Sequence, residues 1–145
     1  MTKKKKKISM QEMLDLLNYD LTYEYATGIQ YIQHAAEMTG AQYGDIISEM
    51  KVHATQELEH AQIFADMIGY LGGTPSIDVG PRHVSKDNVE MLEQDLAGEQ
   101  DAISRYKTRI AQAEQLQEYA LSEELRKILA VEHEHASDLL QALGR

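Results

Sequence analysis

The apolar residues of this chain recur with a period close to 3.6 along almost its whole length, which is the spacing of one buried face on an α-helix. Glycines interrupt this pattern, and so does a short segment that holds both prolines, Pro75 and Pro81. These breaks divide the pattern into four helices, over residues 9–39, 43–71, 85–116 and 118–143. Strand signals are absent, so the pattern predicts an all-α protein.

The ends of the predicted helices carry residues that commonly cap helices. Ser9 with Glu12 three residues later forms a capping box for the first helix, and Ser85 is placed to cap the third. The segment from Gly72 to Val84 is longer than the other two links. We therefore expect a four-helix bundle with a crossover connection between its second and third helices.

The two halves of the sequence repeat each other at an offset of seventy-five residues. Glu-x-x-His occurs once in each half, and other polar and apolar positions recur in register with it. The recurring pairs are Asp20 and Asp95, Glu24 and Glu99, Tyr31 and Tyr106, Glu57 and Glu132, His60 and His135, Gly69 and Gly144, Leu17 and Leu92, Leu21 and Leu96, Phe64 and Leu139, and Ile68 and Leu143. Surface residues have no reason to recur in this way, so we interpret the chain as one helical hairpin used twice.

Six of the recurring polar residues continue helix faces that are otherwise apolar. They are Glu24, Glu57, His60, Glu99, Glu132 and His135. A single Glu-x-x-His usually marks a solvated helix face, but a duplicated set with two further inward glutamates favours a metal site. Four buried carboxylates need compensation, which two divalent cations supply while the imidazoles complete the coordination. Mixed carboxylate and imidazole ligation suits iron or manganese, with zinc as a competitor in vitro.

Composition narrows the class of protein. A chain of 145 residues is long enough for one domain, and the absence of cysteine excludes disulfides and thiolate ligands. The formal charge is −10 even though Lys3–Lys7 are basic, so the body is acidic and suits cations better than nucleic acid. No apolar run is long enough for a secretory signal or a membrane span, so we expect a soluble, cytoplasmic protein. We divide it into a basic disordered tail, residues 1–8, and a helical bundle, residues 9–145.

These residues resemble the ligand pattern of the ferritin-like di-iron carboxylate proteins, for which one Glu from each of two helices and Glu-x-x-His from each of the other two are characteristic. Within them the chain is most similar to bacterioferritin, because the stretch EYATGIQYIQHA, residues 24–35, looks like the first bacterioferritin helix. The resemblance covers residues 10–143. It implies a ferroxidase that oxidises Fe(II) with O2 or H2O2 at a di-iron centre, for iron storage or detoxification.

The resemblance also implies a role for each residue that matches the family pattern. Glu24 and Glu99 would be terminal ligands, Glu57 and Glu132 would bridge the two metals, and His60 and His135 would complete the coordination. Tyr31 and Tyr106 would donate hydrogen bonds to the bridging carboxylates, and Asp20 and Asp95 would orient the histidines.

The other histidines carry weaker signals. His53 lies one turn before Glu57 on the same helix face, so it is either structural or an auxiliary metal ligand. His133 is rotated away from Glu132 and is expected to face solvent or the cavity of a shell. His34 and His83 have no assigned role.

Two departures from bacterioferritin change the expectations. Leu58 stands where that family carries the methionine that binds haem between subunits, so no haem is expected. The sequence ends at Arg145 without the short fifth helix of the family. A homo-oligomeric shell is still expected, but twelve subunits become an alternative to twenty-four.

Other functions share part of this pattern. A Dps-like mini-ferritin would protect DNA from peroxide, and the tail Lys3–Lys7 would then hold DNA, although such tails more often only aid solubility. A rubrerythrin-like peroxidase, a di-iron oxygenase and a manganese catalase would use the same ligands. Rubrerythrins usually add a four-cysteine iron domain, which a chain without cysteine lacks.

Overall fold

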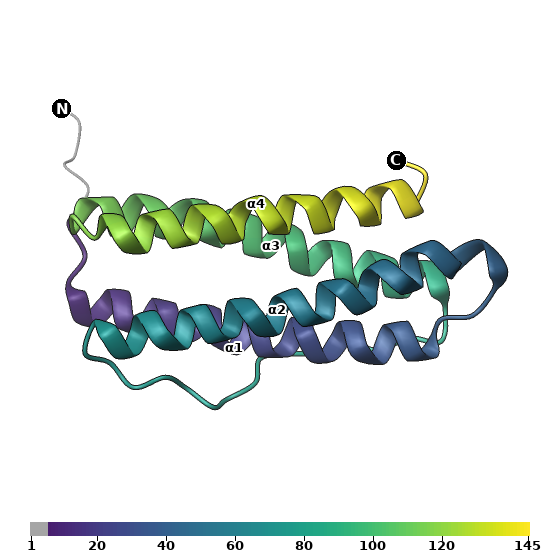
Figure 1. Ribbon diagram of the computed structural model, residues 1–145, viewed down its shortest axis with the longest axis horizontal. Coiled ribbons are helices and arrows are strands. Elements are labelled where there is room, and N and C mark those ends of the chain that lie inside the picture. The colour runs from purple at the N-terminus through teal and green to yellow at the C-terminus, as the bar shows by residue number, and fades with distance from the viewer. Residues whose placement is uncertain (1–5) are drawn as a thin grey trace.

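The computed structural model describes residues 6–145, which form four long helices and one short 3-10 turn (Figure 1). The elements are α1 (Met10–Glu37), η1 (Ala41–Tyr43), α2 (Gly44–Tyr70), α3 (Asn88–Gln115) and α4 (Tyr119–Ala142). No strand occurs in this part of the chain. The prediction of an all-α four-helix bundle is confirmed, with helix ends within a few residues of those expected.

Each half of the sequence forms one helical hairpin. The most extensive helix contacts are those of α1 with α2 and of α3 with α4, and smaller contacts join α1 to α3 and α2 to α4. Figure 1 shows the two hairpins lying along each other, with α1 and α2 on one side and α3 and α4 on the other. This packing places one face of every helix toward a common centre.

The helix starts show one confirmed cap and one correction. Ser9 caps α1, since its Oγ accepts a hydrogen bond from the Glu12 amide at 3.0 Å. The predicted cap of α3 at Ser85 is wrong, because Asp87 accepts the Glu90 amide at 2.9 Å. Ser85 Oγ instead accepts the Asp87 amide at 3.0 Å, which turns the chain just before the helix.

The long connection between α2 and α3 is the predicted crossover, and it runs along α1 (Figure 1). Asn18 fastens its first part, with Nδ2 donating to the Thr74 carbonyl at 3.0 Å and Oδ1 accepting the Ser76 amide at 2.8 Å. Further along, the Gly80 amide donates to the Thr22 carbonyl at 2.9 Å. A Cβ at Gly80 would lie 3.2 Å from that carbonyl oxygen, so glycine suits this close approach.

The bundle has two apolar clusters rather than one continuous core. One cluster is built around Leu17, Phe64 and Leu125, and the other around Met50 and Leu92. Between them lies a layer of buried polar side chains, described below. Packing in both clusters stabilises the helices. Because the helices are fixed on both sides of the polar layer, its side chains are held in place.

Two positions show how helix geometry acts on single residues. Ile32 is 53% exposed although its neighbour Tyr31 is buried, because one residue turns a helix by about 100°. The second helix, expected to end at residue 71, ends at Tyr70, and Gly72 with φ of +93° follows.

The predicted basic tail falls largely outside the described residues, which include none of Lys3, Lys4 and Lys5. Lys6 and Lys7 are exposed, whereas Ile8 packs partly against the cluster around Leu17. The boundary at residue 8 stays a prediction. Among residues 6–145, no helix combines the length and apolar character that crossing a membrane requires.

Candidate metal centre

The six side chains predicted as ligands meet in the middle of the bundle, and none is more than 5% exposed. They form two overlapping groups: Glu24, Glu57, His60 and Glu132, and Glu57, Glu99, Glu132 and His135. Within each group, one ligand atom from every residue lies within 4.8 Å of the others. Glu57 and Glu132 belong to both groups, which is the arrangement of two metal positions that share two carboxylates.

The two histidines each approach a glutamate of the opposite hairpin. His60 Nδ1 lies 2.9 Å from Glu132 Oε1, and His135 Nδ1 lies 2.9 Å from Glu57 Oε1. Glu24 and Glu99 each belong to one group only, and they lie slightly farther from the histidine of that group. His60 Nδ1 is 3.6 Å from Glu24 Oε2, and His135 Nδ1 is 3.3 Å from Glu99 Oε1. Both hairpins must therefore dock before either group is complete.

Several ligand atoms are buried without a hydrogen-bond partner. They are Glu24 Oε2, His60 Nδ1, Glu99 Oε2 and Glu132 Oε1. The 2.9 Å approach of His60 Nδ1 to Glu132 Oε1 is close but is not aligned as a hydrogen bond. Unpaired buried polar atoms are costly, whereas a cation between them would satisfy all of them. The donor set therefore fits divalent metal ions.

The shared glutamates favour their protonated forms when no cation is bound. Burial, followed by repulsion from Glu24 and Glu99, raises the pKa of Glu57 well above its ordinary value. Burial, followed by the charges of Glu57 and Glu99, does the same to the pKa of Glu132. Four carboxylates this close cannot all ionise in a low dielectric.

Glu99 and His60 favour their charged forms. Burial alone would raise the pKa of Glu99, but hydrogen bonds with Glu132 and His135 lower it to about 2. Burial alone would lower the pKa of His60, but Glu132 and Glu24 raise it to about 10. Cations that bind here would displace protons, so binding is expected to weaken as the pH falls.

The two tyrosines donate hydrogen bonds to ligand carboxylates, but not to the expected ones. Tyr31 donates to Glu99 Oε1 at 2.7 Å, and Tyr106 donates to Glu24. The expected partners were the shared glutamates. Because α1 and α3 run in opposite directions, the tyrosine two turns after each glutamate faces the glutamate of the other helix. Burial raises the pKa of both hydroxyls well above the ordinary value, so they remain donors.

Asp20 does not orient a histidine, and this expectation is wrong. Asp20 is fully buried and accepts from Arg109 Nε at 2.6 Å and from Arg105 Nη1 at 2.6 Å. A second contact, from Arg109 Nη2 at 3.1 Å, makes the pair bidentate. The guanidinium groups of Arg105 and Arg109 on α3 thus supply hydrogen bonds to both carboxylate oxygens of Asp20, in place of the expected histidine.

Asp95 also holds a different partner from the one expected. It accepts from Gln30 Nε2 at 2.8 Å and lies 2.9 Å from His34 Nδ1. His34 Nε2 lies 2.9 Å from the His83 carbonyl oxygen, and the His83 amide donates to Gln30 Oε1 at 2.8 Å. Asp95 on α3 therefore orients Gln30 and His34, the two α1 side chains that hold the crossover at His83.

Sequence reasoning missed the partners of both aspartates, although the repeat contained their signal. The offset that relates Asp20 to Asp95 also relates Gln30 to Arg105 and His34 to Arg109. The two halves therefore use the same positions with different chemistry.

His135 is oriented by Gln56, whose Oε1 lies 2.7 Å from His135 Nε2 and leaves Nδ1 directed at the carboxylates.

His53 and His133 lie where the sequence indicated. His133 is exposed. His53 is buried, and its ring stacks on that of His135 with centroids 4.0 Å apart and an interplanar angle of 24°. Its Nε2 lies 2.9 Å from Asp138 Oδ2.

Stability is expected to depend on pH through His34. Burial alone would lower the pKa of His34, but the hydrogen bond and charge of Asp95 raise it above the ordinary 6.5. A histidine whose pKa is higher in the folded protein stabilises the fold below its unfolded pKa and loses this effect as the pH rises through the folded value. We therefore expect the wild type to lose stability relative to His34→Gln as the pH rises from 6.5 into the alkaline range. Urea midpoints of both proteins across this range measure the difference, and parallel curves would contradict the expectation.

The comparison with known proteins agrees with this geometry. The family model described as the ferritin-like domain matches residues 14–145. Bacterioferritin of Mycobacterium leprae is 31% identical over 125 residues, which are 86% of this chain and 79% of that protein.

Two solved structures resemble this chain over most of their length. The dodecameric thioferritin of Bacteroides fragilis, described as bacterioferritin-related, superposes with a TM-score of 0.88 at 30% identity, covering 95% of this chain and 88% of that one. A ferritin-like di-iron carboxylate protein of Bacillus anthracis superposes with a TM-score of 0.89 at 31% identity, covering 94% and 99%.

Proposed function

Because this chain belongs to the ferritin-like domain family, we propose that it is a bacterioferritin-like ferroxidase that takes two Fe(II) ions as substrate inside each bundle. The observation that carries the proposal is the pair of buried ligand groups that share Glu57 and Glu132. Two divalent ions bring four positive charges to four carboxylates, so the loaded site is electrically neutral. Carboxylate and imidazole ligands suit iron in both oxidation states.

The side chains around the site have distinct parts in this reaction. Binding of Fe(II) takes the protons of Glu57 and Glu132 away to solvent. Each Fe(II) then gives one electron to the oxidant, so that O2 with two protons becomes H2O2, or H2O2 with two protons becomes two water molecules. Tyr31 and Tyr106 hold Glu99 and Glu24 in fixed orientations through their hydrogen bonds. The residues proposed as catalytic are the same six ligands.

A homo-oligomeric shell would give the oxidised iron a place to collect. The protein from Bacteroides fragilis is described as dodecameric, and this likeness favours twelve subunits over twenty-four for the present chain. A mini-ferritin that consumes H2O2 is accordingly the second candidate function. Initial rates of Fe(II) oxidation with O2 and with H2O2 distinguish storage from peroxide removal.

The test is aerobic addition of Fe(II) to the metal-free protein, followed by sizing of the particle. We expect a fast phase of Fe(III) absorbance that saturates at two Fe(II) per chain. Continued addition should then fill a particle of uniform size with iron. A chain that shows no fast phase, or saturates at one ion, would overturn the proposal.

Haem binding offers a separate prediction at Leu58. This side chain is 46% exposed on α2 and lies in an apolar hollow with Tyr25, Ile29, Ile77 and Val79. It offers no sulfur for an axial bond, so wild-type protein expressed with ample haem is expected to show no Soret band. Leu58→Met is expected to gain partial haem absorbance, because it places a thioether at the position where the resemblance to bacterioferritin implies the haem ligand.

A methionine placed elsewhere on the same helix controls for non-specific binding. Val52 is 50% exposed on α2, and Val52→Met should stay free of haem. A strong Soret band in the wild type would show that another side chain serves as the haem ligand.

A further inference from the structure

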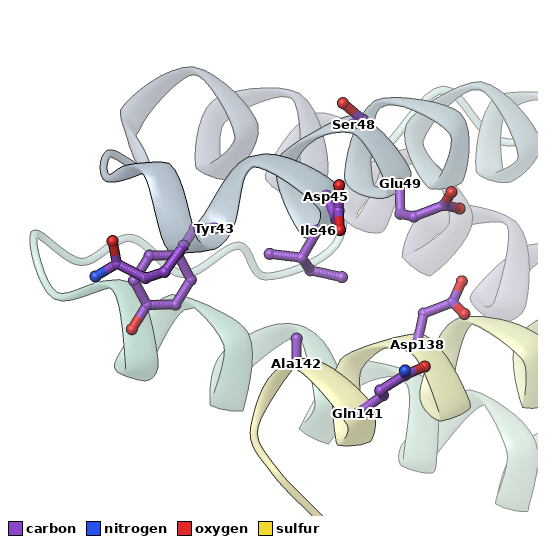
Figure 2. Close-up of a pocket in the computed structure, with 9 residues that line it drawn as sticks. Tyr43, Asp45, Ile46, Ser48, Glu49, Asp138, Gln141 and Ala142 are labelled. Carbon is purple, nitrogen blue, oxygen red and sulfur yellow. The ribbon is translucent and has the colours of Figure 1, made fainter.

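A third group of metal-ligating side chains lies outside the buried centre, between the first half of α2 and the end of α4. It consists of Glu49, His53 and Asp138, each of which offers one ligand atom within 4.8 Å of the others. Figure 2 shows the carboxyl groups of Glu49 on α2 and Asp138 on α4 facing each other across the gap between the two helices. A pocket of about 600 Å³ opens beside them and gives solvent access.

The histidine of this group is held rigidly while the carboxylates reach solvent. His53 is 1% exposed, whereas Glu49 is exposed and the Asp138 side chain is 39% exposed. The imidazole ring stacks on His135, and its edge meets Tyr31 with centroids 5.1 Å apart. Its Nε2 is directed at Asp138 Oδ2, 2.9 Å away. An imidazole fixed in this way loses little further freedom when it binds an ion.

The other ring nitrogen of His53 has no partner that metal binding would displace. Its Nδ1 is buried and has no hydrogen-bond partner. A metal at Nε2 requires the proton to move to Nδ1, and this shift breaks no hydrogen bond at Nδ1. The contact with Asp138 is replaced by a shared ion, so the site exchanges one hydrogen bond for metal coordination.

We propose that Glu49, His53 and Asp138 form a third metal site that takes a divalent transition ion such as Fe(II), Zn(II), Mn(II) or Co(II). One imidazole nitrogen with two carboxylates suits these ions, whereas Mg(II) and Ca(II) prefer oxygen ligands throughout. Three protein ligands leave positions for water, so the ion exchanges with solvent.

The position of this site relates it to the buried centre. His53 lies one helical turn before Glu57 on α2, and Asp138 lies one turn after His135 on α4. An ion held there therefore lies one turn outside the centre, on the side where His53 stacks on His135. The inference concerns binding alone, so it does not require the proposed oxidation of Fe(II).

The test is equilibrium dialysis and visible absorption of the full chain with Co(II) as the probe. We expect three Co(II) per chain in the wild type and two in the double variant Glu49→Gln, Asp138→Asn. Asparagine at position 138 keeps an oxygen that accepts from His53, so the fold is expected to persist. The matched control is Glu59→Gln, Glu134→Gln, which removes two exposed charges from the same helices and should keep three.

A second variant separates this site from the centre. Glu57→Ala with Glu132→Ala removes both shared carboxylates and should leave one Co(II), which is lost when Glu49→Gln and Asp138→Asn are added. If this variant loses the Co(II) ions of the buried centre but keeps the ion at Glu49, His53 and Asp138, the third site is supported independently of the proposed Fe(II) oxidation. Unchanged stoichiometry and affinity in Glu49→Gln, Asp138→Asn would overturn the inference.

Discussion

Replacing Glu57 by alanine is expected to abolish the fast oxidation of Fe(II), with an initial rate lower by at least about 100-fold. Changes to groups that only support metal ligands typically lower affinity or activity by about 10–100-fold, and Glu57 is proposed as a ligand in both metal groups. The helical fold should persist, because burial and repulsion already disfavour the charge of this carboxyl group. Stopped-flow absorbance of Fe(III) measures the rate, and circular dichroism measures helicity.

The matched control for this variant lies two residues further along α2. Glu59 is exposed, so Glu59→Ala changes the same chemical group outside the centre and should oxidise Fe(II) at the wild-type rate. Metal content should fall below two ions per chain in Glu57→Ala only. A wild-type rate in Glu57→Ala would remove the centre from the proposed function.

Replacing Arg109 by methionine is expected to lower the free energy of unfolding by about 3 kcal/mol. Removing one partner of a buried ion pair typically costs about 3–5 kcal/mol, because the other charge stays buried without compensation. The lower end applies here because Arg105 still donates to Asp20. Urea denaturation followed by circular dichroism measures the change as a lower midpoint.

Two further variants decide whether the buried charge is the cause. Adding Asp20→Asn to Arg109→Met should recover part of the loss, since the uncompensated carboxylate is then gone. Lys107 is exposed on the same helix, and Lys107→Met should leave the midpoint nearly unchanged. A loss below about 1 kcal/mol in Arg109→Met would mean that Asp20 is satisfied without this partner.

The sequence predicts the bundle and the ligand cluster well for a physical reason. An apolar face with period 3.6 has to be buried, and glutamates on that face have to be buried with it, as Glu24 and Glu99 are. The repeat then identified the equivalent residues in both halves. The proposed ligand roles themselves stay predictions until metal binding is measured.

The contacts between helices were less predictable. Periodicity gives the direction of a side chain from its own helix, but not the residue opposite it. This is why Tyr31 was assigned the wrong glutamate and Asp20 the wrong partner. The third group was missed for the same reason, because Glu49 and Asp138 are far apart in sequence and meet only where α2 packs on α4.

The division of the chain into two hairpins also bears on how the protein folds. Contacts within each hairpin are closer in sequence than contacts between hairpins, which close a longer loop, so we expect the hairpins to form before they dock. The late docking step is the one that brings the glutamates of the two hairpins together. We therefore expect docking of the hairpins to depend on how the charges of these glutamates are neutralised, by protons or by the cations proposed to bind there.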